Sequence, residues 1–132
     1  MSKQLKKIKK IKHISLKSLR KKAWSLQSEY IRRSENYICF TCGVHLTKAT
    51  SQAGHYIHKD CLDFDSVNIH CQCVRCNKWL SGNQGIYAER LIADYGLDAI
   101  LDLRRRAEVV RKFNVGELSN LIEDYKQKIS AL

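Results

Sequence analysis

Long hydrophobic runs are missing from this sequence of 132 residues. Their absence excludes a membrane-spanning helix, which needs about 20 predominantly apolar residues. The lysine-rich N-terminus never reaches a continuous apolar segment, so it is not a secretory signal peptide, and we expect a cytoplasmic protein in a reducing compartment. The chain also lacks a Gly/Ser-rich linker and internal repeats, while its hydrophobic fraction of 44% excludes wholesale disorder. One compact domain is the natural expectation.

Acidic side chains are scarce, with 13 Asp and Glu against 24 Lys and Arg and a formal net charge of +11. The whole excess lies in residues 1–33, which hold 12 basic side chains and one acid; the other 99 residues hold 12 of each sign. Such a concentrated basic segment suits a polyanion, most commonly nucleic acid. An anionic membrane surface is the competing partner, but the few isoleucines of this segment offer little apolar area for insertion. Residues 1–14 are interpreted as a basic arm, for which a solvated tail is the alternative, and residues 15–132 as a single domain.

A basic helix is predicted to follow the arm. Ser15 has the character of an N-cap, and apolar residues then recur at spacings of three and four until about Ser34. The apolar stripe can pack on a core while the opposite face lies along phosphates. The side chains predicted to contact DNA are Lys17, Arg20, Lys21, Lys22 and Arg32.

Three further helical patterns occupy the C-terminal part, about residues 86–132. They cover roughly residues 87–94, ending at Gly96, then 98–113, and 115–130, where Asn114 and Glu117 have the spacing of a capping box. The apolar residues of these segments are predicted to be core: Leu91, Ile92, Ile100, Leu101, Leu103, Val109, Val110, Leu118, Leu121, Ile122 and Tyr125.

The middle of the chain, about residues 37–85, holds all six cysteines, four of them in two Cys-x-x-Cys pairs. Two such pairs can supply four thiolates to one tetrahedral Zn²⁺, and a site without an open position is structural. Redox pairs or ordinary buried cysteines are the alternatives. The predicted zinc ligands are Cys39, Cys42, Cys73 and Cys76, whereas Cys61 and Cys71 are interpreted as small apolar fillers.

Several motifs lie between and after the cysteine pairs: Ala53-Gly54-His55-Tyr56, Asn68-Ile69-His70, Cys76-Asn77 and Ser81-Gly82-Asn83. Their order resembles the HNH, or ββα-metal, nucleases. Over about residues 38–96 the agreement is closer still with the phage lambda NinG (Rap) recombination proteins, a family of branched-DNA endonucleases. The resemblance implies an α+β fold in which a small zinc-stapled ββα-metal core is flanked by the basic helix and the C-terminal helices.

The resemblance also implies a catalytic site. His55 would be the general base, Asn68 would fix the orientation or tautomer of its ring, and Asn77 would bind a catalytic Mg²⁺ or Mn²⁺. Phosphodiester hydrolysis requires a base for water and a cation for the transition state, and a neutral imidazole can serve as the base near pH 7. The structural zinc would fix the position of Asn77 through its neighbour Cys76.

One position departs from the family pattern, because Gly54 stands where many HNH enzymes carry a metal-binding acid. Asn77 then acts alone or with a second ligand, for which His70 is the strongest candidate; a structural, hydrogen-bonded role is its alternative. The other candidates for this second ligand are Asp60, Asp63, Asp65 and His58. Nearby, Tyr56 and Trp79 are predicted to be core, with base stacking as the alternative role of Trp79.

The sequence thus favours a metal-dependent DNA endonuclease acting on branched recombination intermediates, such as Holliday junctions or D-loops, in phage recombination. If it is phage-encoded, its place of action is the cytoplasm of the bacterial host. The alternative is a non-catalytic zinc-containing DNA-binding module. Cleaving a symmetric junction calls for two active sites, so a homodimer is expected if that substrate is right.

Overall fold

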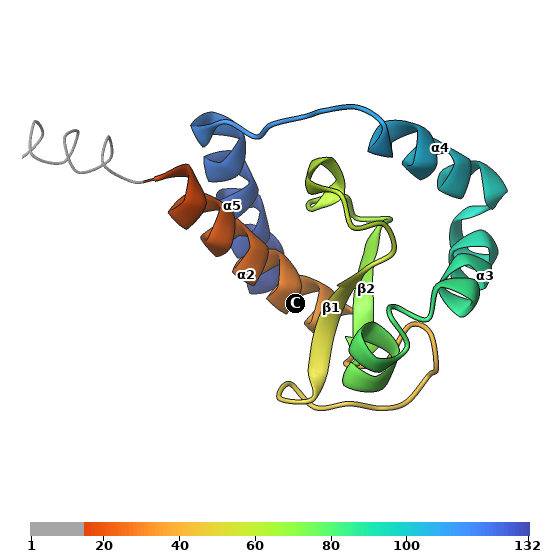
Figure 1. The fold of residues 1–132 in the computed structure, drawn as a ribbon. Helices are drawn as coiled ribbons and strands as arrows, with labels where there is room; N and C mark the ends of the chain where they lie inside the picture. Colours follow the sequence, from red (N-terminus) through yellow and green to blue (C-terminus); the bar gives the residue numbers. More distant parts are fainter. Residues whose placement is uncertain (1–14) are drawn as a thin grey trace, which may run out of the picture.

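A computed structural model describes residues 15–132; the arm expected at residues 1–14 lies outside them. The structure confirms a mixed α+β domain. A two-stranded hairpin lies at its centre, between one helix pair, α2 with α5, and another, α3 with α4 (Figure 1). In chain order the elements are α2 (Leu16–Ser34), β1 (Ser51–His55), the 3₁₀ turn η1 (Asp60–Leu62), β2 (Ile69–Cys73), the π-helical turn η2 (Arg75–Trp79), α3 (Gln84–Tyr95), α4 (Leu97–Ala107) and α5 (Val115–Ser130).

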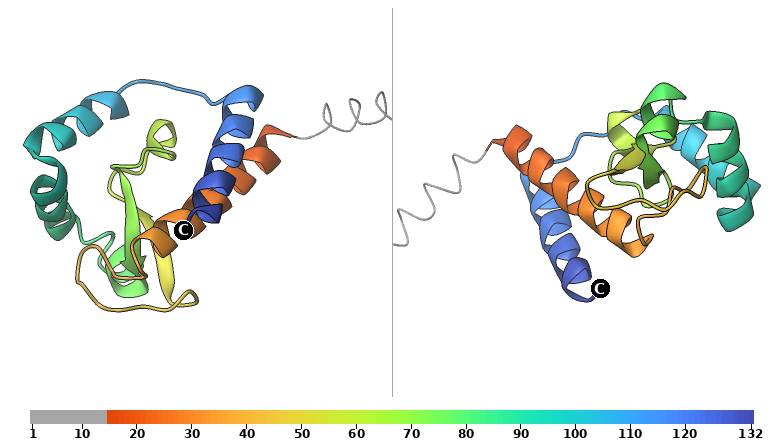
Figure 2. Two further views of the ribbon diagram at one scale, coloured as in Figure 1. Left: turned by 180° about the vertical axis from the view of Figure 1, so that it is seen from behind. Right: turned by 90° about the horizontal axis from the view of Figure 1, so that it is seen from below.

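The basic helix α2 forms where it was predicted. The Ser15 hydroxyl oxygen accepts a hydrogen bond from Ser18 N at 3.1 Å, which caps the N-terminus. Figure 2 shows α2 and α5 side by side, and their apolar faces enclose a small core of Leu19, Ala23, Leu118 and Ile122. Two segments almost a hundred residues apart in sequence therefore support each other.

Helix α5 begins with the predicted capping box. Glu117 N donates to Asn114 Oδ1 at 2.8 Å, and the Glu117 carboxylate accepts from Asn114 N. Further along the helix, Tyr125 Oη donates to the buried Gln27 Oε1 at 2.9 Å. This bond ties α5 to α2 through the polar part of their interface.

Strands β1 and β2 are antiparallel, with register running from Ser51 opposite Cys73 to His55 opposite Ile69. Because side chains alternate along a strand, the two faces of the hairpin differ. One face, which carries His55, packs against α2. The other face carries Gln52 and Gly54 and lies towards η2 and α3.

A second core lies between the hairpin and the α3–α4 pair. It contains the predicted core residue Tyr56 and is centred on Tyr87, which is completely buried and donates its hydroxyl proton to Gly54 O at 2.7 Å. Its buried members are Tyr56, Leu62, Tyr87, Leu91, Ile100 and Leu103. This hydrogen bond anchors the backbone of β1 immediately before His55.

The predicted helix 98–113 is too long, since α4 ends at Ala107 and residues 108–114 are irregular. Val109 and Val110 were predicted to be core but are 59% and 88% exposed. Three arginines fill the last turn of α4, where their charges favour a helix C-terminus, and Ala107 is the last residue packed on the core. Because the next two apolar residues, Val109 and Val110, are exposed, a further turn of helix would gain no stabilisation from packing there.

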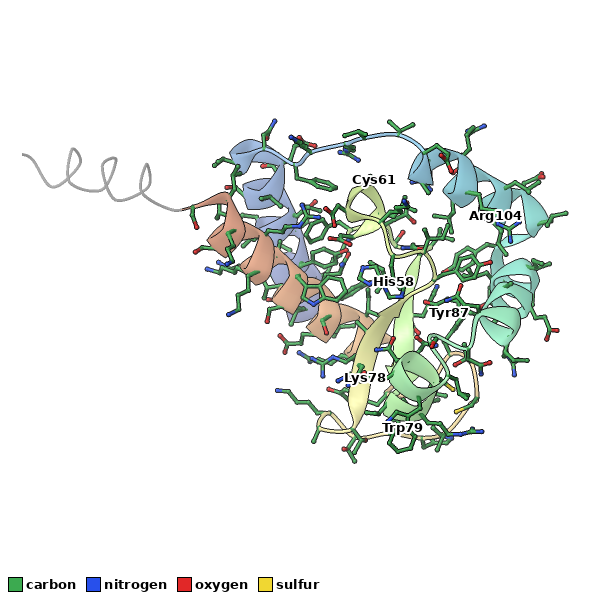
Figure 3. The ribbon with its side chains drawn as sticks, in the orientation of Figure 1. His58, Cys61, Lys78, Trp79, Tyr87 and Arg104 are labelled. Carbon is green, nitrogen blue, oxygen red and sulfur yellow. The ribbon has the colours of Figure 1, made fainter. Side chains whose placement is uncertain are left out.

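Three other apolar residues were wrongly predicted to be buried: Ile92, Leu101 and Trp79. Helices α3 and α4 each pack with a single narrow face, which leaves Ile92 and Leu101 outside it. Trp79 is 76% exposed at the outer end of η2, next to Lys78 (Figure 3). Among residues 15–132, no helix is both long and apolar enough to cross a bilayer.

Candidate functional site

Four cysteine sulfurs meet at the end of the hairpin. The Sγ atoms of Cys39, Cys42, Cys73 and Cys76 all lie within 4.8 Å of one another, and none of these cysteines is in a disulfide. The Cys42 and Cys73 sulfurs are 3.8 Å apart. A regular tetrahedron with Zn–S bonds of about 2.3 Å requires a sulfur separation of about 3.8 Å. The cluster could therefore hold a zinc ion, and within residues 15–132 it is the only such group of His, Cys, Asp or Glu side chains.

Local backbone geometry brings the two cysteine pairs together. Gly43 has φ +79° and donates its N–H to Cys39 O at 2.8 Å, which closes the first turn. Cys73 ends β2, and its sulfur accepts from Cys76 N at 3.4 Å in the turn that starts η2. Phe40 N donates to Cys71 O at 2.7 Å and links the first turn to the strand.

Desolvation and hydrogen bonding shift the pKa values of the clustered cysteines in opposite directions. Desolvation raises the pKa of Cys42 to about 12, whereas at Cys39 burial is outweighed by hydrogen bonds, led by that of Thr41, and the pKa falls to about 6. A cation must therefore displace a tightly held proton before all four sulfurs are thiolates. Cys61 and Cys71 lie outside the cluster, as predicted.

His55, the predicted base, ends β1 on the face that packs against α2. Its ring stacks on Trp24, with centroids 4.7 Å apart and an interplanar angle of 11°. Its Nε2 atom is buried and lies 3.4 Å from Asp63 Oδ1, without a hydrogen-bond partner among the described residues. Burial raises the pKa of Asp63, but the side chains of His55 and Arg20 outweigh it, and the pKa is lowered. An ionised carboxylate therefore faces the imidazole.

An open cleft of about 330 Å³ lies beside His55. Two of the predicted DNA contacts, Lys17 and Lys21, are exposed on its wall, and Lys22 is exposed on the same helix. The cleft is lined by Lys17, Arg20, Lys21, Trp24, His55, Asp63 and Phe64. The structure thus brings the basic helix and the predicted base to one surface.

Arg20 and Arg32, the other two predicted DNA contacts, form hydrogen bonds within the protein. Arg20 Nη2 donates to Asp63 Oδ2 at 2.6 Å and to Asp60 O at 3.1 Å, so it links α2 to the loop after β1. Arg32 Nη1 donates to Lys48 O at 3.1 Å and links α2 to the turn before β1. Both arginines therefore hold the helix against the hairpin.

Asn68 is completely buried, and its side chain closes the loop between the strands. Its Oδ1 accepts from Ile57 N at 2.8 Å, and its Nδ2 donates to Ile57 O at 2.9 Å and to Leu62 O at 3.3 Å. None of its described hydrogen bonds reaches His55. Asn68 instead shapes the loop that carries Asp63, so any influence on the imidazole passes through that loop.

Asn77 lies on the other face of the hairpin, in η2. Its Nδ2 donates to Gln52 Oε1 at 2.8 Å, and its Oδ1 faces Gly54. A Cβ atom at residue 54 would come within 2.9 Å of Asn77 Oδ1 and would overlap Gln72 Oε1. No described hydrogen bond joins Asn77 to His55. Asn77 faces Gly54, which is the residue before His55 in β1.

His70 has the contacts of a structural residue. Its Nδ1 lies 2.9 Å from Glu35 Oε2, its Nε2 lies 3.0 Å from Val67 O, and its ring stacks on Phe40. With both nitrogens engaged and the residue only 5% exposed, the geometry favours the structural alternative over metal binding.

The remaining candidates for a second metal ligand surround the loop after β1. Asp65 is engaged, since its Oδ2 accepts from Arg106 Nη1 at 2.6 Å and its Oδ1 accepts from backbone amides. Asp60 and His58 are exposed, and the His58 ring lies 5.7 Å from that of His55, centroid to centroid (Figure 3). None of them forms a described hydrogen bond with Asn77.

The whole sequence is similar to one family of phage proteins. The family model described as Bacteriophage Lambda NinG protein matches residues 1–132. The chain belongs to the NinG family. It is 34% identical over 116 residues to Protein ninG of Escherichia phage lambda, which is 85% of this chain and 56% of that protein, and equally so to Protein ninG of Salmonella phage P22. With Protein ninG of Escherichia phage 933W the identity is 35%, over 85% of this chain and 57% of that protein.

This NinG-family chain spans somewhat more than half the length of the curated relatives it matches. No solved structure matches it. Two of its site residues were not singled out by sequence reasoning: Trp24 against His55, and Gln72 against Gly54. Asp63 was considered as a metal ligand, and the structure instead places it as the acidic neighbour of His55. Trp24 lies within the predicted helix, but only the packing of α2 on the hairpin shows that it meets His55.

Proposed function

We propose that this NinG-family protein is a metal-dependent DNA endonuclease of the HNH type, acting on branched recombination intermediates. The observation that carries the proposal is the position of His55, which ends a hairpin strand and faces a lysine-lined cleft. A second supporting feature is that the hairpin is followed at once by a helical turn bearing Asn77, since the family resemblance implies two strands and a helix around the catalytic metal. The branched substrate comes from the family resemblance alone.

The cleft can accommodate a DNA backbone next to His55, the proposed general base. Lys17 and Lys21 can neutralise phosphates on either side of the scissile bond, and they are borne by a rigid helix that is fixed to the hairpin by Arg20. Asp63 beside Nε2 favours a proton on that nitrogen, which leaves Nδ1 of His55 with the lone pair that accepts a proton from water. The stacked Trp24 holds the ring in this orientation.

A divalent cation fits the other side of β1. Asn77 Oδ1 has no donor among the described residues and faces the bare backbone of Gly54, so it is free to act as an oxygen ligand. When bound there, Mg²⁺ or Mn²⁺ would neutralise charge on the phosphate and on the leaving oxygen. The chain's own contribution is the placement of Asn77, because the zinc site that we propose at the four cysteines includes its neighbour Cys76.

One observation favours the alternative of a non-catalytic DNA-binding module. Residue 54 has no room for the acid that many HNH enzymes use. The module and the nuclease both predict DNA binding by α2, but only the nuclease predicts strand scission that depends on His55.

The deciding experiment incubates zinc-loaded protein with a four-way junction and with linear duplex DNA, in Mg²⁺, Mn²⁺ or EDTA. We expect divalent-dependent cleavage that is lost in His55→Ala while DNA binding persists. His45→Ala is the matched control, because His45 is exposed and does not line the cleft. Binding without scission by the wild type in both cations would refute the nuclease and leave the module. Equal cleavage of the duplex and the junction would refute the branched preference alone.

A further inference from the structure

Gln72 presents a buried oxygen without a partner. The side chain is completely buried in β2, and its Nε2 donates both protons, to Thr41 Oγ1 at 3.2 Å and to Gly82 O at 3.0 Å. Because Gly82 O can only accept, these bonds establish which end of the amide is the nitrogen. Oε1 is then left with no donor among the described residues. Buried polar atoms without a partner are rare in native proteins, so this one requires an explanation.

The unpartnered oxygen points at the same place as Asn77 Oδ1. A Cβ atom on Gly54 would overlap Gln72 Oε1 and would lie within 2.9 Å of Asn77 Oδ1. Two amide oxygens, one from β2 and one from η2, therefore converge on the backbone of β1. Residue 54 must be glycine, because the Gln72 amide fills the space that a Cβ atom at this position would occupy. The same overlap explains why no acid stands at residue 54.

We propose that Gln72 Oε1 is the second protein ligand of the divalent cation, beside Asn77 Oδ1, and that it replaces the acid missing at residue 54. This inference rests on the proposed function. Amide oxygens are hard donors of the kind that Mg²⁺ and Mn²⁺ accept, and the two come from different elements that the zinc-binding turn holds together. An inward-facing oxygen without a donor is available to a cation without breaking any bond of the protein.

An amide in place of the acid changes the negative charge that the protein offers to the cation. A pair of neutral amide ligands contributes no negative charge, whereas an acid and an amide contribute one. The cation is then held weakly by the protein alone and more tightly once phosphate oxygens join the shell. We expect the affinity for Mn²⁺ to rise on addition of uncleaved DNA.

The first test leaves the chain unaltered. Mn²⁺ is titrated into zinc-loaded, ¹⁵N-labelled wild-type protein, and paramagnetic broadening of the side-chain amide signals is followed. We expect the signals of Gln72 and Asn77 to broaden first. Gln27 is the internal control, because it is equally buried but is bonded to Tyr125 and Asp63 O. Broadening of Asn77 while Gln72 behaves like Gln27 would overturn the proposal.

Variants provide the second test. Gln72→Met keeps the length of the side chain without its oxygen, and we expect at least about tenfold weaker Mn²⁺ binding by calorimetry, with zinc content unchanged. Gln27→Met is the matched control and should bind Mn²⁺ as the wild type does. The double variant Gly54→Asp/Gln72→Ala makes room for an acid and should regain Mn²⁺ binding.

The outcomes separate the two proposals. If wild-type protein cleaves DNA and Gln72→Met binds Mn²⁺ with wild-type affinity, only the role of Gln72 is overturned, and a buried water molecule is then the partner of Oε1. If Gln72→Met fails to fold, the broadening experiment on the wild type decides. If wild-type protein neither binds Mn²⁺ nor cleaves, the proposed nuclease function fails together with this ligand.

Discussion

Replacing one of the four cysteines that we propose to bind zinc should unfold the centre of the domain. In Cys73→Ser the four-sulfur cluster loses the residue that joins β2 to η2. Structural zinc contributes roughly 10–16 kcal/mol in small peptides, whereas a whole domain is stable by only about 5–15 kcal/mol. The cysteine cluster has a single partly buried apolar neighbour, Leu46, so little packing can replace the metal. We therefore expect that the free energy lost with zinc binding exceeds the free energy of unfolding of the hairpin region.

The assay combines metal analysis with circular dichroism and thermal unfolding. Wild-type protein should contain about one zinc per chain, and Cys73→Ser should contain none and lose its cooperative unfolding transition. Part of the helical signal should persist, because α2 and α5 share a separate apolar core. Cys61→Ser is the matched control and should keep its zinc, since Cys61 lies outside the cluster. A zinc-free Cys73→Ser protein that unfolds at the wild-type temperature would refute the reasoning.

Three further predictions follow from individual contacts. Tyr87→Phe removes the buried donor to Gly54 O and should lower the free energy of unfolding by about 1–3 kcal/mol in urea titrations; an unchanged value would contradict that bond. Lys17→Ala/Lys21→Ala should weaken DNA binding, and the slope of log affinity against log salt in anisotropy titrations should fall by about two; an unchanged slope would remove both lysines from the interface. The pKa of Asp63 is lowered in the folded state, so its carboxylate stabilises the protein above the unfolded pKa of about 3.9, and this contribution disappears as the pH falls through the folded value. The stability gap between wild type and Asp63→Asn should therefore be present at pH 6 and close at lower pH; a gap independent of pH would show that the carboxylate charge contributes nothing.

Local patterns carried most of the correct predictions. The N-cap at Ser15, the capping box at Asn114 and the end of α3 at Gly96 depend on residues a few positions apart, and the structure has all three. The predicted helix that extended to residue 113 was wrong because periodicity cannot tell whether a partner surface is present. Val110 has the right spacing and type for a core residue, yet nothing in the described structure covers it.

The sequence by itself determined the family, the four cysteines that could hold zinc and the basic helix, because each is encoded in residue types at short, regular spacings. Tertiary structure alone decided the environment of the candidate site. Asp63 faces His55 because the loop closed by the buried Asn68 returns it to β1, and Gln72 meets Gly54 because of the hairpin register. Contacts of this kind join segments that are distant in sequence, and they depend on how strands pair and helices pack, which no local pattern specifies.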